Sequence, residues 1–205
     1  MPDRGRCLDL LVPGREVAIV AASGPQRRTR FTALLARSGS GTWVSLDPAG
    51  APRLVEEALR RNLLPSLAGL QVIRREVNVI SRQLRARIDL LLAPVSEHAS
   101  ETLCEVKSVG AQRDGVALFP DAPTVRGVRH LTLLASLSRR GRPCAVVFCA
   151  QRGDVRAVAP DADIGPVFAA SLRRAARAGV RIAALACAAK PSGMELRGEI
   201  PVLLS

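Results

Sequence analysis

The feature that most constrains this chain is an uncharged, almost wholly apolar run at residues 143–151 (PCAVVFCAQ). Such a run is typical of a strand that is buried on both faces, as in sheets whose parallel crossovers carry helices. Residues 180–188 repeat the pattern directly after Gly179, which ends a helical segment. Together the two runs predict an α/β fold with parallel strands in its sheet.

The segments around these two strands complete the predicted order of elements. Helices are expected at residues 52–62, 124–140 and 163–178, where apolar side chains recur at helical spacing between Pro and Gly signals. Further strands are expected at residues 71–80, 86–93, 102–109 and 199–204. The order α-β-β-β-α-β-α-β describes a mixed sheet flanked by helices, with antiparallel hairpins first and parallel crossovers after them.

The first fifty residues differ in character from the rest. Three short apolar or β-branched runs, at residues 16–22, 30–36 and 42–46, are separated by turns rich in Gly and Ser. Strands at this spacing predict part of a small β-barrel. Because Asp47-Pro48-Ala49-Gly50 marks a break, we predict a partial β domain over residues 1–50 and an α/β domain over residues 51–205.

The net charge of the chain and the positions of its basic residues indicate which class of ligand it binds. The chain has 30 Lys and Arg against 18 Asp and Glu, a net charge of +12, and its basic residues cluster at 74–87, 124–142 and 171–182. Such patches suit a phosphate backbone, although composition does not separate DNA from RNA and a generic solvated surface is the alternative. No apolar run has the length of a membrane span, and no signal peptide is evident. We therefore expect a cytoplasmic protein that binds nucleic acid and no membrane.

One constellation of residues could carry chemistry. Glu105 and Lys107 share a face if residues 102–109 form a strand, and a hairpin with the preceding strand brings Asp89 beside Glu105. Two adjacent carboxylates suit Mg²⁺, with Mn²⁺ as a substitute. The ammonium could orient or deprotonate a water, or neutralise charge on the phosphorus. Asp followed by Glu-x-Lys on the next strand is the active-site pattern of the PD-(D/E)xK nuclease fold, and the order of elements agrees with it.

Other residues could join this site. Glu57 and Glu76 are candidate further acids, but a solvated helix face and an ion pair with neighbouring arginines are the respective alternatives. Arg126 and His130 lie four residues apart on a predicted helix, so they share a face that could meet the scissile phosphate or could form a surface pair. Arg152 directly follows the buried strand and is a candidate phosphate contact.

The chain resembles the sugar fermentation stimulation protein (SfsA) family along nearly its whole length. The matching stretches occur in order: LVPG at 11–14, LVEEAL at 54–59, RREV at 74–77, RID at 87–89, EVKSV at 105–109, FPDA at 119–122, T-x-RG at 124–127, HL at 130–131, QR-x-D at 151–154 and IPVL at 200–203. The resemblance implies an OB-like barrel joined to a nuclease-like domain that binds DNA, with a role in regulating sugar (maltose) metabolism.

The resemblance also implies roles for single residues. It places Asp89, Glu105 and Lys107 in the nuclease-like site, with the two carboxylates on the metal. The nucleic-acid contacts that it implies are Arg87, Arg126, His130, Gln151 and Arg152.

The chain departs from the family pattern in two places. The resemblance implies that about thirty residues of the barrel, one or two strands, are missing before Met1, which we interpret as a misassigned start or a truncation that exposes a sheet edge. Residues 79–87 are expected to form an Arg-rich link that is longer than in the family.

Three hypotheses follow. The first is a DNA-binding protein with a Mg²⁺-dependent phosphodiesterase site, and the second is a non-catalytic DNA-binding regulator of sugar metabolism. The third is a protein-interaction module at the open barrel edge. Oligomeric state stays undetermined at this stage.

Overall fold

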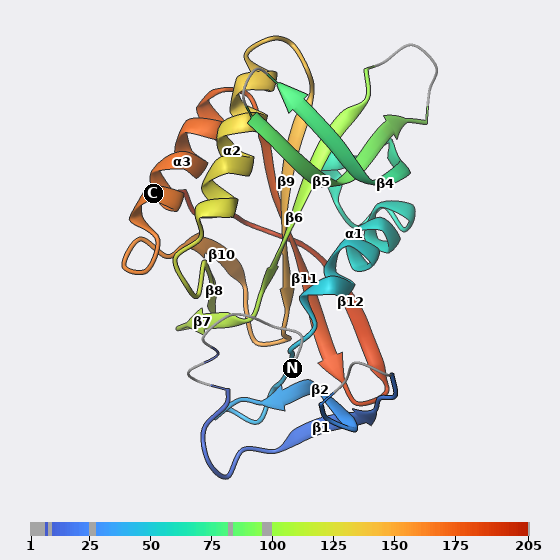
Figure 1. Cartoon of the computed structure of the whole chain (residues 1–205), viewed down its shortest axis with the longest axis vertical. Coiled ribbons are helices and arrows are strands. Elements are labelled where there is room, and N and C mark those ends of the chain that lie inside the picture. Colours follow the sequence, from blue (N-terminus) through green and yellow to red (C-terminus); the bar gives the residue numbers. More distant parts are fainter. Residues whose placement is uncertain (1–6, 8–9, 25–27, 82–83, 96–99, 205) are drawn as a thin grey trace.

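A six-stranded mixed sheet forms the centre of the molecule (Figure 1). The computed structural model describes all residues except 1–6, 8–9, 25–27, 82–83, 96–99 and 205. The spatial order of the strands is β12 (Gly193–Ile200), β11 (Arg181–Lys190), β9 (Cys144–Gln151), β6 (Thr102–Val109), β5 (Leu84–Pro94) and β4 (Leu70–Ser81). The three central strands β11, β9 and β6 are parallel, and the outer pairings are antiparallel.

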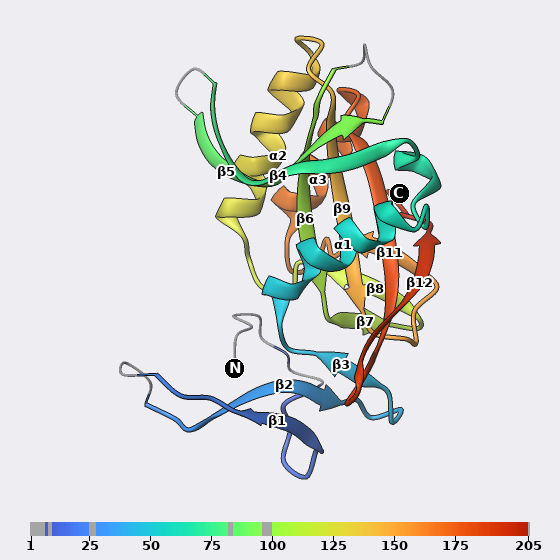
Figure 2. The ribbon, with the colours of Figure 1, turned by 90° about the vertical axis from the view of Figure 1, so that its right-hand side faces the viewer.

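Helices cover both faces of this sheet. In Figure 2, α1 (Ala51–Arg60) lies on the viewer's side, whereas α2 (Val125–Ser138) and α3 (Pro166–Arg177) lie on the far side. One apolar core fills the space on each face, and all eight residues of β9 are buried between the two cores. The predicted α/β fold, a mixed sheet flanked by helices with a doubly buried central strand, is therefore confirmed.

The N-terminal part is a separate antiparallel sheet of β1 (Val17–Ala21), β2 (Phe31–Arg37) and β3 (Trp43–Ser45). It lies at one end of the large sheet, shown in blue in Figure 1. Isolated backbone pairings of Val44 with Arg152, and of Arg152 with Cys187, link the two sheets. The three strands predicted in this region are confirmed.

Several elements differ from the prediction. The last strand is β12, which begins at Gly193 and pairs with β11 as a hairpin, instead of the predicted 199–204. Met194 and Leu196 alternate with charged residues along it and pack on the core beside α1, but the alternation breaks at Arg197 and Gly198, where the register with β11 shifts. The expected link at 79–87 is instead the continuation of β4 to Ser81 and of β5 from Leu84. A small sheet of β7 (Ala111–Arg113), β8 (Val116–Phe119) and β10 (Ala157–Pro160), and the short turns η1 (Pro48–Gly50) and η2 (Pro65–Leu67), were not predicted.

A helix cap and close packing fix the first turn of α2, which carries Arg126. The Thr124 hydroxyl accepts a hydrogen bond from the Gly127 amide at 3.0 Å, which caps the helix. A Cβ at Gly127 would lie 2.9 Å from the Thr124 side chain and 3.1 Å from the Phe168 ring of α3. Glycine therefore lets α3 pack closely against this first turn. None of the helices in the described part of the chain has the length and apolar character that a membrane span needs.

Candidate active site

The sheet opens into a fork between β5 and β6. The two strands pair from Leu92–Thr102 to Leu90–Cys104, and the described pairing ends there. Asp89 is the next residue of β5, and its Oδ2 accepts a hydrogen bond from the Val106 amide at 2.7 Å. The carboxylate thus binds a main-chain donor where the strands part, which holds it inside the fork.

Glu105 lies in the same fork, on β6. Its Oε1 accepts hydrogen bonds from the Lys107 ammonium and from Nδ1 of His130, the latter at 2.6 Å. The ring nitrogen is the donor because an ionised carboxylate has no proton to give. The other oxygen, Oε2, is buried and has no hydrogen-bond partner among the described residues. A buried carboxylate oxygen without a partner is costly unless a cation or a donor reaches it.

The two carboxylates influence each other's ionisation. Burial, and then the charge of Glu105, raise the pKa of Asp89 to about 6, although the Val106 amide, Lys107 and His130 act in the opposite direction. Burial also acts to raise the pKa of Glu105, but the hydrogen bond from His130 and the charge of Lys107 outweigh it, so that pKa is lowered. At neutral pH both groups are therefore ionised, and Asp89 is ionised at a cost that a nearby cation would relieve.

These residues fit a divalent cation. Asp89 and Glu105 would hold it, because the buried Oε2 of Glu105 lacks a partner and the charge of Glu105 acts on the Asp89 carboxylate. Within the described ranges, no group of three or more His, Cys, Asp or Glu side chains is arranged to bind a metal. The protein would therefore supply two carboxylates, which suits Mg²⁺ because that ion retains waters and takes oxygens from a bound phosphate.

We expect His130 to set the geometry of this pair. Replacing His130 with Ala removes one of the two donors on Glu105 Oε1, so Mn²⁺ affinity should fall by about 10- to 100-fold, as for other residues that orient metal ligands. His130→Asn keeps a side-chain amide donor and should restore part of the affinity. Mn²⁺ titration followed by electron paramagnetic resonance measures both variants, and equal losses in the two would contradict the prediction.

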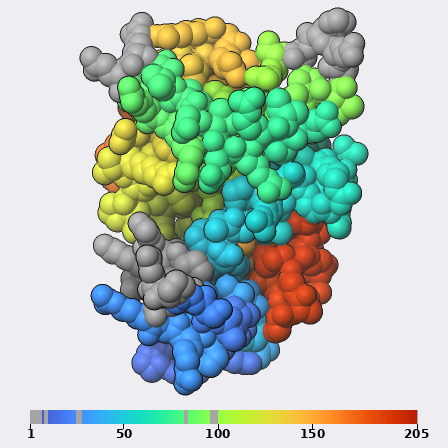
Figure 3. Space-filling view, turned by 45° about the vertical axis from the view of Figure 1, so that its right-hand side comes forward, coloured from blue at the N-terminus to red at the C-terminus, as the bar shows by residue number. Residues whose placement is uncertain are grey.

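Two clefts flank the fork and share Arg126. One, of 420 Å³, is lined by Lys107, Thr124 and Arg126 together with main-chain and apolar groups of β6 and β8. The other, of 300 Å³, lies between β5 and α2 and is lined by Arg85, Ala86, Arg87, Arg126, Arg129 and His130. Figure 3 shows the surface of β4 and β5 (green) directly beside that of α2 (yellow).

The structure brings together the central residues that the sequence singles out. Asp89, Glu105, Lys107 and His130 meet in the fork, while Arg87 and Arg126 line the cleft beside it. Sequence reasoning missed Arg85 and Arg129 as individual residues of the site. The signal was present, because both lie in the basic clusters 74–87 and 124–142 and stand two and three residues from Arg87 and Arg126.

The two additional acids form ion pairs outside the fork. Glu57 contacts Arg60 and Arg61 at 2.6 and 2.5 Å on α1, as its solvated-face interpretation expects. Glu76 occupies the position opposite Asp89 in the β4–β5 register, but its φ is +54°. Its exposed carboxylate contacts Arg87 at 3.4 Å.

The structure does not support the predicted phosphate contact at Arg152. Its side chain is 0% exposed and makes a bidentate pair with Asp154, with N–O distances of 2.6 and 2.9 Å. A further bond of 2.5 Å runs from its guanidinium to the Gly110 carbonyl. The main chain of Arg152 pairs with Val44 at the junction between the N-terminal sheet and the large sheet, and the guanidinium is buried there on Asp154 and the Gly110 carbonyl.

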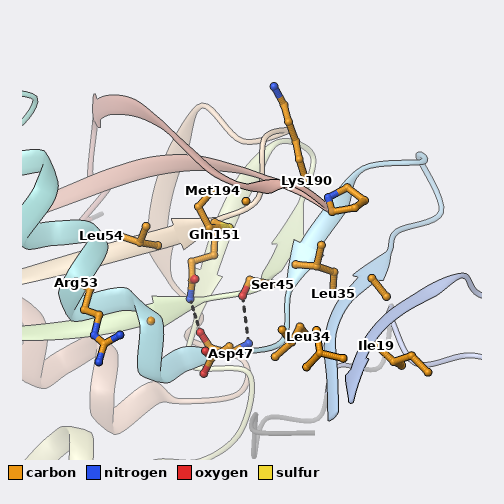
Figure 4. A pocket seen from close by; sticks show the side chains of 15 residues that line it. Ile19, Leu34, Leu35, Ser45, Asp47, Arg53, Leu54, Gln151, Lys190 and Met194 are labelled. Carbon is orange, nitrogen blue, oxygen red and sulfur yellow. Dashed lines mark hydrogen bonds between the residues drawn. The ribbon is translucent and has the colours of Figure 1, made fainter. Parts of the chain in front are cut away.

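Gln151 also belongs to this junction, so a nucleic-acid contact in the fork is not supported. Its Nε2 donates to the Asp47 carbonyl at 3.1 Å and to the Ser108 hydroxyl at 2.8 Å. It lines a mostly apolar cavity of 490 Å³ between the N-terminal sheet, α1 and the β11–β12 hairpin (Figure 4). Asp89, Glu105 and Lys107 do not line that cavity.

Fold and site together define a class of protein. A mixed sheet that forks at an Asp, with Glu-x-Lys on the next strand and helices on both faces, is the architecture of the PD-(D/E)xK nuclease fold. Two protein-family models agree with this architecture and identify the family. The "Sugar fermentation stimulation protein RE domain" matches residues 49–193, and the "SfsA N-terminal OB domain" matches residues 1–46. The chain belongs to the sugar fermentation stimulation protein family.

Individual relatives support this assignment. A sugar fermentation stimulation protein homolog of Alkalilimnicola ehrlichii is 43% identical over 98% of this chain and 84% of its own length. That of Chloroflexus aurantiacus is 43% identical over 100% of this chain and 76% of its own length. The solved structure of Pyrococcus furiosus SfsA in complex with Ca²⁺ matches with a TM-score of 0.86 and 28% identity, over 99% of this chain and 84% of that one.

Proposed function

We propose that this chain is a cytoplasmic DNA-binding protein whose α/β part carries a Mg²⁺-dependent phosphodiesterase site, with Mn²⁺ as a substitute. The observation that carries the proposal is the pairing of Asp89 with Glu105 in the fork, where one buried Glu105 oxygen lacks a partner and the Lys107 ammonium lies alongside. The Pyrococcus furiosus relative was solved in complex with Ca²⁺, which supports divalent-cation binding by this chain as well.

Each residue of the fork has a separate role in the proposed hydrolysis. A bound divalent cation supplies Lewis-acid stabilisation of charge on the phosphate when Asp89 and Glu105 hold it. Lys107 orients the attacking water and neutralises charge that develops on the phosphate oxygens. His130 keeps Glu105 in place through Oε1, and Oε2, which lacks a partner, would be the oxygen that Glu105 offers to a cation. Arg126, at the meeting point of the two clefts, binds the phosphate.

Replacing Lys107 with Met tests the catalytic part of the proposal. Because loss of one preorganised charge-stabilising donor costs about 10²- to 10³-fold, cleavage of labelled DNA in Mg²⁺ should fall at least about 100-fold. DNA binding should change little. Cleavage and gel shifts are measured on single- and double-stranded DNA and RNA in Mg²⁺, Mn²⁺ or EDTA, with Asp89→Asn alongside. Arg197→Gln, on the exposed edge strand β12 and outside the basic clusters, is the control for the loss of one positive charge.

A non-catalytic DNA-binding regulator of sugar (maltose) metabolism is the second candidate. It is favoured by the ion pair between Lys107 and Glu105, which partly satisfies this carboxylate without any metal. Binding to DNA without cleavage in any cation, unchanged by Lys107→Met and Asp89→Asn, would support the regulator and contradict the phosphodiesterase.

A further inference from the structure

The cleft between β5 and α2 concentrates positive charge. Four exposed arginines line it, and no acidic residue does: Arg85, Arg87, Arg126 and Arg129, which we call the arginine cleft. Many exposed arginines elsewhere pair with a carboxylate, as Arg37 does with Glu16. In the arginine cleft, the described ion pairs include only that of Arg87 with Glu76, at 3.4 Å. The cleft therefore presents guanidinium groups that a bound anion would satisfy.

The fork explains why these arginines gather. Since β5 leaves β6 beyond Leu90, its edge at Arg85 and Arg87 is not covered by β6 and faces α2. Arg126 and Arg129 lie three residues apart on α2 and are therefore neighbours on the helix surface. His130 lines the same cleft and contacts Glu105, so the cleft leads directly to the candidate carboxylates.

The cleft on the other side of the fork is different. Its charged lining residues are Lys107, Arg126 and the acidic Asp121, and the rest of its lining is mostly apolar or main-chain. Positive charge thus continues from Arg126 along β5 and α2, but not toward β8. A polynucleotide strand whose scissile phosphate lies at Arg126 would therefore meet further arginines on only one side of that phosphate.

We infer that the arginine cleft is a subsite for the phosphates that flank the scissile bond on one side, with Arg85 and Arg129 binding the phosphates beyond Arg126. The inference rests on the proposed function and makes its substrate class more specific. The substrate is a polynucleotide strand that continues on the β5 side of the site, as opposed to a mononucleotide or a small phosphodiester. Contacts of this kind position the backbone without reading sequence.

Cleavage of oligonucleotides with uncharged methylphosphonate linkages on one side of the cleaved bond tests this asymmetry. Neutral linkages on one side should lower kcat/KM at least about tenfold, and neutral linkages on the other side should have little effect. In the double variant Arg85→Gln/Arg129→Gln, kcat/KM on the unmodified oligonucleotide should fall by the same factor. The neutral linkages that lower kcat/KM of the natural chain should cause no further decrease in this variant. Equal sensitivity on both sides, or full additivity of variant and linkage, would overturn the inference.

Binding without catalysis provides an independent readout. In Ca²⁺ or EDTA, the slope of log affinity against log salt should decrease in magnitude by about 1.4 for the double variant on single-stranded DNA, since each phosphate contact contributes about 0.7. Arg197→Gln on β12, at the opposite edge of the sheet and outside the basic clusters, should leave the slope unchanged. If cleavage is absent but the slope decreases, the phosphate subsite stands and the phosphodiesterase fails. An unchanged slope in the double variant overturns the subsite whatever the cleavage result.

Discussion

Replacing Arg152 with Met should lower the free energy of unfolding by about 3–5 kcal/mol, the usual cost of removing one partner of a buried ion pair. Methionine keeps much of the apolar stem but removes the donors to Asp154 and to the Gly110 carbonyl. These acceptors then lie in the junction between the two sheets without their partner, while the backbone pairing of residue 152 with Val44 is kept.

Urea unfolding at pH 7 measures this effect. Arg142→Met is the matched control, because Arg142 contacts Glu101 at 3.3 Å with both side chains nearly half exposed. Exposed pairs contribute about 0–1 kcal/mol, so the control should unfold close to the natural chain. Similar losses in the two variants would show that burial of Arg152 does not make its pair special.

Replacing Asp89 with Asn should stabilise the metal-free protein at pH 8 by about 2–3 kcal/mol while abolishing cation binding. The folded chain raises the pKa of Asp89 from an ordinary value near 4 to about 6. A tenfold change in proton affinity corresponds to about 1.4 kcal/mol, so ionised Asp89 destabilises the fold by roughly that difference. The cost is complete above pH 6 and disappears as pH falls toward 4, because the carboxyl is then protonated in both states.

Unfolding in EDTA at several pH values from 4 to 8 tests whether the ionised carboxylate of Asp89 destabilises the folded protein. The gain from Asp89→Asn should be largest at pH 8 and should vanish near pH 4, because Asn can still accept from the Val106 amide. Asp163→Asn is the control, since its carboxylate is 79% exposed. A gain that does not vary with pH, or a loss of stability at pH 8, would contradict the assigned cost of the Asp89 charge.

The central trio could be predicted because it depends on local geometry. Strand alternation places Glu105 and Lys107 on one face, and a neighbouring antiparallel strand brings Asp89 to the same point. The contact between His130 and Glu105 could not be predicted in this way, because the partners are 25 residues apart and meet only when α2 packs on the sheet. The sequence indicated that His130 faces the site but not that it binds a carboxylate.

Arg152 and Gln151 show the converse case, in which the sequence suggests site residues that the structure places elsewhere. They share the basic and polar character of a ligand contact, and they lie at the end of a strand in the way that many site residues do. Whether such a side chain faces a ligand or a neighbouring sheet depends on what packs against the strand end. Here the N-terminal sheet packs there, so both residues hold the junction together.

The sequence by itself determined the α/β class, most helices and strands, the basic surface and the pairing of Asp89 with Glu-x-Lys. These properties follow from side-chain periodicity and spacing, which are local. Only the tertiary structure decided that β5 and β6 separate at Asp89, that one Glu105 oxygen is left buried without a partner, and that four arginines line one side of the fork. Burial, pKa values and the grouping of charge depend on residues far apart in the chain, so they arise only when the sheet, the helices and the N-terminal sheet have packed together.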